Sequence, residues 1–288
     1  MCDEFERSRR RLEGIAYRMC GVLADAQDIV QETHLKWCAT DQSSIRDPHS
    51  WLVTVCSRLA VDTLKSARRR RETYVGLWLP EPFVDVDPAS PAAQAQIDES
   101  VSVALMVALE MLTPSQRAAF LLHDVFGYRF DEVARTLGQS ELSCRKLASR
   151  ARKAVRAERP KELVDPEQHQ ELLDAFFEAV HLGELETLKS LLQASVELHA
   201  DGGGRVKTAT TVLCGPDAVA GFFLRIWREQ VPTRESVRLE TRWFNGSPGV
   251  LIYQHDRLVA AISLALERGA IRRIFALRNP DKLTAFDG

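Results

Sequence analysis

The sequence of 288 residues predicts a multidomain protein, with two all-helical modules followed by an α+β domain. Up to about residue 163, apolar residues recur at three- and four-residue steps, which is typical of amphipathic helices. Residues 73–96 hold four of the 12 prolines, and proline at this density disfavours helix. From about residue 166, β-branched and alternating segments become frequent, as they are in strands.

The composition is that of a protein with packed cores. The hydrophobic fraction is 45% and the charged fraction 27%, and both are ordinary for a soluble chain. The sequence contains no run of about 18 apolar residues, so we expect no membrane span. The start of the chain is charged and has no apolar signal segment. The six cysteines form no CxxC pair. We therefore expect no metal and no cofactor, and unpaired thiols that fit a reducing cytoplasm.

The net charge of −2 hides a strong segregation of charge along the chain. Residues 1–71 carry 13 basic and 10 acidic side chains. Residues 72–112 carry no basic and seven acidic side chains. Residues 113–163 carry 11 basic and six acidic side chains. Two basic blocks divided by an acidic segment predict two modules that face a polyanion, joined by a linker that avoids or imitates it.

Residues 1–72 are expected to form the first helical module. Its apolar faces lie within residues 29–37 and 51–64, and a polar loop at residues 40–50 separates them. The second helix ends in four arginines, at positions 68–71. Because they end an amphipathic helix, we expect them to present their charge to phosphate.

One face of the first of these two helices carries an acidic stripe, opposite Ile29, Val30 and Leu35. The stripe consists of Asp25, Asp28, Gln31 and Glu32. Such a stripe is most often solvated surface, so the residues alone leave its role open.

Residues 73–96 are expected to form an acidic, proline-rich linker in extended conformation. Its apolar side chains are too many to stay solvated, so part of it should dock on a neighbouring surface. These side chains are Tyr74, Leu77, Trp78, Leu79 and Phe83.

Residues 97–163 are expected to form the second helical module. Thr113, Pro114 and Gln116 match an N-cap, a first-turn proline and a capping box. Gly127 is well placed to end that helix.

The segment from Glu132 to Arg156 has the pattern of a helix-turn-helix unit. Gly138 allows the turn between a short helix and a longer one that Ser140 caps. Between Glu141 and Lys161, eight basic residues stand against two acidic ones. This charge favours phosphate contacts, and the alternative is an ordinary solvated helix in a bundle.

Residues 164–288 are expected to form the α+β domain, in which one or two helices within residues 169–193 lead into antiparallel strands. A further helix is expected at residues 216–227. The strand candidates are residues 195–200, 206–213, 236–244, 249–255, 258–266 and 270–277.

The order and spacing of three segments resemble the sigma-70 family, in its small extracytoplasmic-function branch. Residues 25–37, DAQDIVQETHLKW, resemble region 2.2, residues 50–71 resemble regions 2.3–2.4, and residues 112–155 resemble region 4. WLPEP at 78–82, with the two motifs DGGGR (201–205) and NPDKL (279–283), is similar to the group of these factors that carries a fused SnoaL-like domain of the NTF2 fold. The resemblance covers nearly the whole chain and implies an RNA polymerase sigma factor that directs transcription initiation.

The resemblance also implies roles for particular residues. The acidic stripe, Asp25, Asp28, Gln31 and Glu32, would bind the clamp helices of the β′ subunit of core polymerase, and the β flap would be a second contact. The residues that would engage the melted −10 element are Ser43, Ser44, Arg46, Arg58, Lys65, Arg68 and Arg69. The residues that would read the −35 duplex are Ser143, Arg145, Lys146, Ser149, Arg150 and Lys153. The acidic linker would thread toward the RNA channel of the polymerase.

The recognition helix departs from the family pattern. Many relatives have a Thr-Val-Lys-Ser-like run where this chain has Ser143-Cys144-Arg145-Lys146. Promoter preference therefore does not transfer residue by residue.

We hypothesise that the C-terminal domain regulates the factor in cis, in place of a separate anti-sigma factor. The contact residues would be Trp78, Leu79, Pro80, Asp201, Gly202, Gly203, Gly204, Asn279, Pro280 and Asp281. A phosphate-binding loop at DGGGR is a weaker interpretation, because no Gly-Lys-Ser/Thr follows.

Two alternatives remain open. One is a helix-turn-helix regulator with a ligand-sensing domain. The other is a SnoaL-like cyclase or isomerase fused to a DNA-binding module, in which His199 and Asp201, on one strand face, or His255 and Asp256 would be the acid/base candidates. A small ligand could also occupy a C-terminal cavity lined by aromatic side chains, although such side chains are more often core. The aromatic candidates are Phe222, Phe223, Trp227, Trp243 and Phe275.

Overall fold

The structure of the chain is a computed structural model that describes residues 3–71, 73–84, 102–158, 165–230 and 237–287. By their contacts, the residues form two compact units. The first consists of Met1–Thr73 and Leu105–Arg159, and the second of Tyr74–Ala104 and Pro160–Gly288. Residues 74–84 of the expected linker therefore belong to the second unit by their contacts. Among the described helices, none is both long and apolar enough to cross a membrane.

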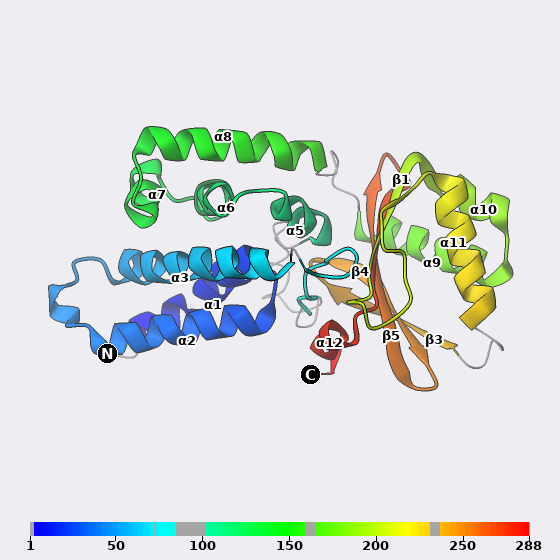
Figure 1. Cartoon of the computed structure of the whole chain (residues 1–288), viewed down its shortest axis with the longest axis horizontal. Helices are drawn as coiled ribbons and strands as arrows, with labels where there is room; N and C mark the ends of the chain where they lie inside the picture. The colour runs from blue at the N-terminus through cyan, green and yellow to red at the C-terminus, as the bar shows by residue number, and fades with distance from the viewer. Residues whose placement is uncertain (1–2, 72, 85–101, 159–164, 231–236, 288) are drawn as a thin grey trace. The chain divides into compact units, whose positions relative to one another are not determined.

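Three helices form the first bundle of the first unit (Figure 1): α1 (Asp3–Cys20), α2 (Leu23–Ala39) and α3 (Pro48–Arg71). Their apolar faces meet in a core that includes the fully buried side chains of Phe5, Leu12 and Leu52. A short 3₁₀ helix, η1 (Gln42–Ser44), lies in the polar loop between α2 and α3.

Among the described residues, four further helices belong to the first unit, although α5 begins two residues before it: α5 (Val103–Glu110), α6 (Pro114–Phe120), α7 (Phe130–Leu137) and α8 (Glu141–Glu158). The predicted capping box of Thr113 and Gln116 is present at the start of α6. A π-helical turn, Leu121–Val125, extends α6. Gly138 adopts a left-handed conformation with φ 63° between α7 and α8, as the expected sharp turn requires.

A buried ion network joins the two helical parts of the first unit. Arg117 on α6 is 1% exposed and donates to Glu110 on α5 and, through Nε at 2.9 Å, to the carbonyl of Arg18 on α1. Arg71, at the end of α3, donates to the same Glu110 carboxylate. Burial would raise the pKa of Glu110, but the charges of Arg117 and Arg71 hold it below its ordinary value. Arg71 thus pairs with an interior carboxylate, and the expectation that it presents its charge to phosphate was wrong.

The second unit contains a six-stranded sheet in the order β2-β1-β6-β5-β4-β3. Its strands are β1 (Leu192–Asp201), β2 (Leu213–Cys214), β3 (Val237–Phe244), β4 (Ser247–Gln254), β5 (Arg257–Glu267) and β6 (Ala270–Leu277). The helices are α9 (Pro166–Leu182), α10 (Leu185–Ser190), α11 (Pro216–Gln230) and α12 (Pro280–Leu283), followed by the 3₁₀ helix η5 (Thr284–Phe286). Within this unit, α9, α10 and α11 lie against one face of the sheet (Figure 1).

Two expectations for this sheet need correction. Strands β1 and β6 pair in parallel, so the sheet is mixed and not purely antiparallel. Of the candidate strand at residues 206–213, only Leu213 lies in a strand, because β2 consists of Leu213–Cys214. The backbone before β2 instead turns tightly after Asp201, where the amides of Arg205 and Val206 both donate to the carbonyl of Gly202.

The core of the second unit lies between the sheet and the helices α9 to α11. Its fully buried members include Phe176 on α9, Val196 on β1 and Ile274 on β6. Two all-helical modules followed by an α+β domain are therefore confirmed as the fold class.

Candidate functional site

The acidic stripe on α2 lies at the protein surface. Asp28, Gln31 and Glu32 are exposed, and Asp25 is half-buried. Glu32 pairs with Lys36 one turn further along the helix, with 3.1 Å between Oε1 and Nζ. A pair between two exposed side chains contributes little to stability, so the stripe keeps carboxylates that a partner protein can reach.

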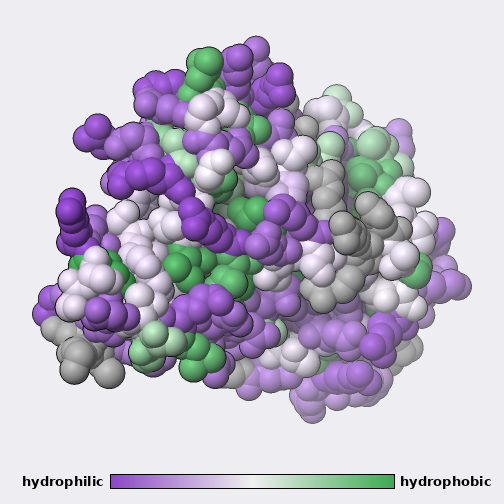
Figure 2. Space-filling model, turned by 60° about the vertical axis from the view of Figure 1, so that its left-hand side comes forward, coloured by the Kyte–Doolittle hydropathy of each residue, from purple (hydrophilic) through white to green (hydrophobic). Residues whose placement is uncertain are grey.

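Leu35 was expected on the apolar side of α2, and this was wrong. It is 62% exposed, because it follows Asp28 by seven residues and Glu32 by three, which places it on the acidic face. The side of the molecule in Figure 2 is mostly hydrophilic, with apolar side chains in separate small patches. A leucine at the end of the acidic stripe gives this face an apolar contact point that charge patterning alone had missed.

The loop between α2 and α3 presents short polar side chains. Ser43, Ser44 and Arg46 are all exposed. Asp41 caps η1 by accepting from the Ser43 backbone at 3.0 Å and from the Ser43 hydroxyl at 2.7 Å. These hydrogen bonds, that of the Ser43 side chain first, lower the pKa of Asp41. The loop is thus held in one conformation while its outward side chains stay free of the bundle core.

Arg58, on α3, contacts the helix-turn-helix region. Its Nε donates to the Thr136 carbonyl at 2.8 Å and its Nη2 to the Arg135 carbonyl at 2.9 Å. Both carbonyls belong to the last turn of α7, where a helix leaves acceptors without intrahelical partners and carries partial negative charge. The Arg58 guanidinium is therefore engaged by backbone acceptors of α7 in this structure.

The other basic residues of α3 differ in their surroundings. Lys65 is exposed and pairs with Asp62, with 2.8 Å between Nζ and Oδ1. The side chains of Arg68 and Arg69 lie outside the described residues, although both belong to α3.

A second contact between the two helical parts surrounds Tyr128, which precedes α7. Its hydroxyl oxygen lies 2.9 Å from Arg11 Nε on α1 and 3.0 Å from His49 Nε2 on α3. Burial raises the pKa of Tyr128. Thr54 and Thr136 add a contact of 3.2 Å between their hydroxyls. The second helical module therefore packs on the helix that carries the expected −10 residues.

Helix α8 has the two-sided character that its sequence predicts. Cys144, Ala148 and Ala151 are fully buried. The exposed face carries Arg145, Lys146, Ser149, Arg150 and Lys153, while Ser143 is half-buried.

Some of the polar side chains near the start of α8 also make contacts within the protein. Arg145 pairs with Glu141, with 2.5 Å between Nη2 and Oε1, and lies over the Phe130 ring. Ser143 donates to Gln139 at 2.8 Å. These contacts hold the side chains on the outer surface of the helix, and the Arg145 pair, being exposed, is weak enough to exchange for another anion.

The three motifs of the second unit meet around the carboxylate of Asp201, which is fully buried at the end of β1. Its Oδ1 accepts from the Tyr74 hydroxyl at 2.6 Å and from the Gly203 amide at 2.9 Å. Its Oδ2 accepts from the Leu79 amide at 2.9 Å and from Lys282 Nζ at 2.7 Å. We refer to Asp201, Tyr74, Leu79, Lys282 and Asn279 as the Asp201 cluster.

Asn279 and Lys282 of the Asp201 cluster make further contacts with the linker. Asn279 Nδ2 donates to the Tyr74 hydroxyl at 2.9 Å. Lys282 Nζ also donates to the Leu79 carbonyl and lies 4.2 Å from the centre of the Trp78 ring. Burial, and then the hydrogen bond to Asp201, raises the pKa of Tyr74. Each polar group is satisfied by a group from another segment, so the arrangement depends on all three motifs together.

All three DGGGR glycines are required by close approach, since a Cβ on Gly202 would lie 2.6 Å from the Val206 carbonyl oxygen. The other two also have positive φ. Gly203 has φ 62°, and a Cβ on it would lie 2.5 Å from Nδ2 of Asn279. Gly204 has φ 69°, and its Cβ would lie 3.0 Å from Cβ of Val75 in the linker. Only glycine combines this backbone conformation with these distances. Gly202, Pro280 and Asp281 flank the cluster, and Asp281 pairs with Arg205 at 3.0 Å.

The linker has a second attachment that the sequence did not suggest. The Phe83 amide donates to Asn245 Oδ1 at 3.0 Å, and the Asn245 amide donates to the Phe83 carbonyl at 2.8 Å. Val84 forms an isolated β-bridge with Phe244. Asn245 is fully buried with φ 52°, a left-handed conformation that asparagine tolerates. Leu79, Pro80 and Pro82 are buried, so residues 74–84 dock along the second unit, as the apolar content predicted. The expectation was wrong for the Phe83 side chain, which is 40% exposed.

The suggested acid/base pair of His199 and Asp201 does not form. His199 Nε2 lies 3.0 Å from Glu197 Oε2, and Glu197 also accepts from Arg273 Nε at 2.8 Å. Asp201 lies in the Asp201 cluster. His255 and Asp256 occupy the turn between β4 and β5, both with positive φ. Neither pair has the arrangement of a catalytic dyad in a cavity.

Three of the five aromatic residues suggested for a cavity do line one. Phe222, Phe223 and Trp227, all on α11, face a pocket of the second unit. Trp243 and Phe275 are not among the lining residues. Phe275 is instead buried, with its ring centre 5.6 Å from that of His199.

Comparison with known families identifies the two helical modules. Residues 5–70 match sigma-70 region 2, and residues 102–155 match sigma-70, region 4. Together with the relatives described next, these matches show that the chain belongs to the extracytoplasmic-function sigma factors of the sigma-70 family, which act with RNA polymerase.

The similarity to individual members extends over both units. The chain is 41% identical to the extracytoplasmic-function sigma factor SigJ of Mycobacterium tuberculosis, over 98% of this chain and 93% of that protein. It is 33% identical to the probable sigma factor SigI of the same species, over 96% and 92%. The crystal structure of M. tuberculosis SigJ matches with a TM-score of 0.80 at 38% identity, covering 99% of each chain.

Proposed function

We propose that the second unit regulates this sigma factor in cis by binding the linker between regions 2 and 4. The Asp201 cluster is the observation that supports the proposal. A fully buried carboxylate accepts from Tyr74 and Leu79 of the linker and pairs with Lys282 of the same unit. Release of the linker would take two hydrogen-bond donors from a buried carboxylate, which is costly, so we treat linker binding and release as two distinct states.

Release of the linker would change the reach between regions 2 and 4. With residues 74–84 docked, residues 85–101 are left to connect to α5, and 17 residues span at most about 60 Å. The free connection from residue 72 to residue 102 spans at most about 100 Å. The −35 and −10 elements are named for their positions, which differ by about 25 base pairs. At about 3.4 Å per base pair, this is roughly 85 Å of duplex. Docking fixes the distance between residues 74 and 84, so only the shorter segment can adjust its length, and release of the linker would make a spacing of this size easier to reach.

We assign the acidic stripe of α2, together with Leu35, to the clamp helices of the β′ subunit. Leu35 adds exposed apolar surface beside the carboxylates, and protein interfaces combine apolar and polar contacts in this way. Region 4 would contact the β flap, and the acidic linker would pass toward the RNA channel.

We assign the exposed side chains of α8 to the −35 duplex, with Arg145 and Lys146 nearest the helix start that enters the groove. Ser43, Ser44, Arg46, Lys65, Arg68 and Arg69 are assigned to the −10 element, together with Arg58. Because Arg58 binds the end of α7 in the free protein, region 4 must leave α3 before Arg58 can reach DNA.

Run-off transcription with core polymerase tests the cis regulation. The full chain is compared with a truncation after residue 165 and with Asp201→Asn, and Asp256→Asn serves as a matched control at an exposed turn. We expect the first two variants to change promoter output and Asp256→Asn to match the parent. Equal output from all four proteins would contradict the regulatory role.

Co-purification separates this function from its alternatives. A sigma factor is retained by core polymerase and binds its promoter well only as holoenzyme, whereas a helix-turn-helix regulator binds its operator without polymerase. Binding of promoter DNA that is equally tight with and without polymerase would favour the regulator. We propose that the second unit has no catalytic role, and the geometry of His199 and Asp201 supports this.

A further inference from the structure

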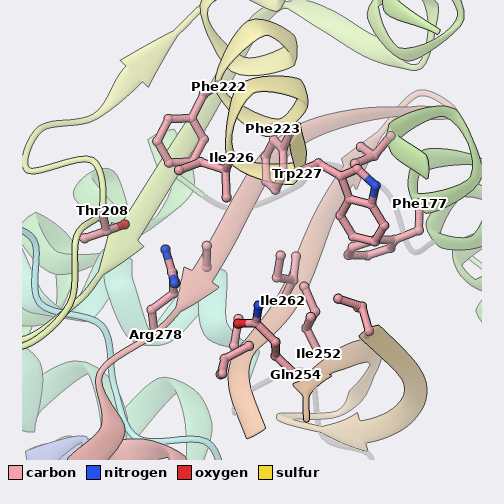
Figure 3. A pocket seen from close by; sticks show the side chains of 15 residues that line it. Phe177, Thr208, Phe222, Phe223, Ile226, Trp227, Ile252, Gln254, Ile262 and Arg278 are labelled. Carbon is pink, nitrogen blue, oxygen red and sulfur yellow. The ribbon is translucent and has the colours of Figure 1, made fainter. Parts of the chain in front are cut away.

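A cavity in the second unit lies between α11 and the sheet. Fifteen residues line it, and most of them are apolar (Figure 3). The cavity has a volume of about 70 Å³. On the same measure, one ordered water needs roughly 10–15 Å³. Phe177 and Trp227 lie on one side, and Phe222 and Phe223 reach in from α11. The space therefore suits the apolar body of a small organic molecule better than a single water.

Polar groups gather on the opposite side of this cavity, where strands end. Gln254 is the last residue of β4, and Arg278 follows β6 directly. Thr208 belongs to the segment between β1 and β2. Figure 3 shows the Arg278 and Gln254 side chains across the cavity from those of α11, with the Thr208 hydroxyl turned toward the Arg278 side. A cavity with an apolar wall and a polar end selects a ligand with the same division.

The polar end carries positive charge. Of the fifteen described residues that line the cavity, Arg278 alone is charged. Its Nη1 donates to the backbone carbonyl of Lys207 at 2.9 Å. Burial lowers the pKa of the Arg278 guanidinium. A cation that faces an apolar space is disfavoured by desolvation, and an anion placed there would offset this cost.

Thr208 provides an independent sign of a missing partner. Its Oγ1 is buried and has no hydrogen-bond partner among the described residues. A buried hydroxyl without a partner destabilises the folded state. A rotation of the Thr208 side chain toward the cavity would let a ligand oxygen accept from it.

We propose that this cavity binds a small apolar carboxylic acid in its ionised form. Its ring or short alkyl chain would contact Phe177, Phe223 and Trp227. Its carboxylate would accept hydrogen bonds from Arg278, Gln254 and Thr208. The planar guanidinium matches the two oxygens of a carboxylate, whereas a phosphate dianion would call for more cationic partners than the one lining arginine.

The polar end of the cavity adjoins the Asp201 cluster. The Arg278 backbone amide donates to the Asp201 carbonyl at 2.7 Å, and the next residue, Asn279, donates to Tyr74. On the other side, a Cβ on Gly202 would lie 2.7 Å from Cγ2 of Thr208. Movement of Arg278 or Thr208 toward a ligand is thus transmitted to residues that bind the linker. This effect on transcription rests on the cis regulation proposed above, whereas the binding site does not.

Isothermal titration of the full chain tests the site. The probes are benzoate and hexanoate, each with its neutral amide of the same shape. We expect the acids to bind more tightly than the amides, and Arg278→Gln to weaken acid binding roughly 10- to 100-fold with little change for the amides. Arg268→Gln, at the exposed turn between β5 and β6, is the matched control and should bind like the parent.

Ile226→Trp should fill the cavity and abolish binding of both acids and amides, which keeps the test valid if Arg278→Gln fails to fold. Equal affinity for acids and amides, or acid binding that survives Ile226→Trp, would overturn the site. No binding of either acid up to millimolar concentration would do so as well.

Run-off transcription with the better-binding acid tests the coupling. We expect the acid to change the promoter output of the parent and of Arg268→Gln, but not of Arg278→Gln. If the acid binds and output stays constant, the coupling is overturned and the binding site stands. Failure of cis regulation itself is recognised separately, because Asp201→Asn and the truncation are compared without any acid.

Discussion

Asp201 and Lys282 form a buried ion pair, with 2.7 Å between Oδ2 and Nζ. The carboxylate is fully buried and the lysine is 6% exposed. Asp201 ends β1 and Lys282 lies in α12, and the linker passes beside both through Tyr74 and Leu79. Their pairing brings DGGGR, NPDKL and WLPEP, which are far apart in the sequence, into one cluster.

Asp201→Asn should destabilise the second unit. The change removes the carboxylate partner of Lys282, and loss of one member of a buried pair costs about 3–5 kcal/mol. Urea unfolding of the full chain, followed by tryptophan fluorescence, measures this. Asp256→Asn, at an exposed turn, should change the free energy of unfolding by less than about 0.5 kcal/mol, and equal effects of the two changes would contradict the role of the pair.

Gly203→Ala should release the linker. The new Cβ would meet the Asn279 side chain, and the residue would keep a positive φ. Gly269→Ala is the matched control, because Gly269 also has positive φ but nothing within 4 Å of a built Cβ. We expect faster proteolysis within residues 74–84 for Gly203→Ala only. Similar cleavage of both variants would mean that backbone strain alone is responsible.

Tyr128→Phe should loosen region 4 from α3. It removes the hydroxyl that contacts Arg11 and His49, and each lost hydrogen bond is worth about 0.5–1.5 kcal/mol. Energy transfer between labels on Cys38 and an Arg150→Cys site reports the separation, with exposed Cys214 and also Cys2 changed to serine. We expect lower transfer efficiency than in the parent, while Tyr253→Phe in the second unit should leave it unchanged.

Leu35→Ala should weaken polymerase binding without weakening the fold. Leu35 is 62% exposed, so its removal takes no side chain from the core, whereas full burial of a leucine side chain at an interface is worth about 1.5–3 kcal/mol. Competition for core polymerase should show roughly a 10-fold loss. Leu142→Ala is a fair control, since Leu142 is 64% exposed on α8, and an equal loss there would remove the assignment to the α2 face.

His169 should make stability depend on pH. It lies in α9 with its Nε2 buried and without a hydrogen-bond partner among the described residues, and burial lowers its pKa to about 4. The unfolded chain, with a pKa near 6.5, then binds more protons than the folded one between these values. Stability from this residue is complete above about pH 6.5 and falls as the pH drops toward about 4, by at most about 3 kcal/mol.

Substitution of His169 tests whether this residue causes the pH dependence of stability. His169→Leu should flatten the dependence of the free energy of unfolding on pH between 6.5 and 4, and His255→Gln, at an exposed turn, should not. An unchanged slope in His169→Leu would attribute the effect to other groups.

Much of the helical architecture could be predicted because it depends on near neighbours. The Thr113 capping box, the Gly138 turn and the buried stripe of α8 are all encoded within a few residues. The prediction of a strand at residues 206–213 was wrong because it also relied on near neighbours alone. Its β-branched pattern is local, but the tight turn after Asp201 and the contact with Arg278 decide its conformation.

The sequence by itself determined the helical modules, the apolar linker that must dock and the motifs that mark the sigma-70 family. Tertiary structure alone decided that Arg71 pairs with Glu110, that Arg58 binds the end of α7 and that Lys282 reaches Asp201. Arg71 and Glu110 are 39 residues apart, Arg58 and Arg135 are 77 apart, and Asp201 and Lys282 are 81 apart. Periodicity and capping report only on residues one or two turns apart, whereas a buried charge takes whichever opposite charge or carbonyl the packed core places beside it.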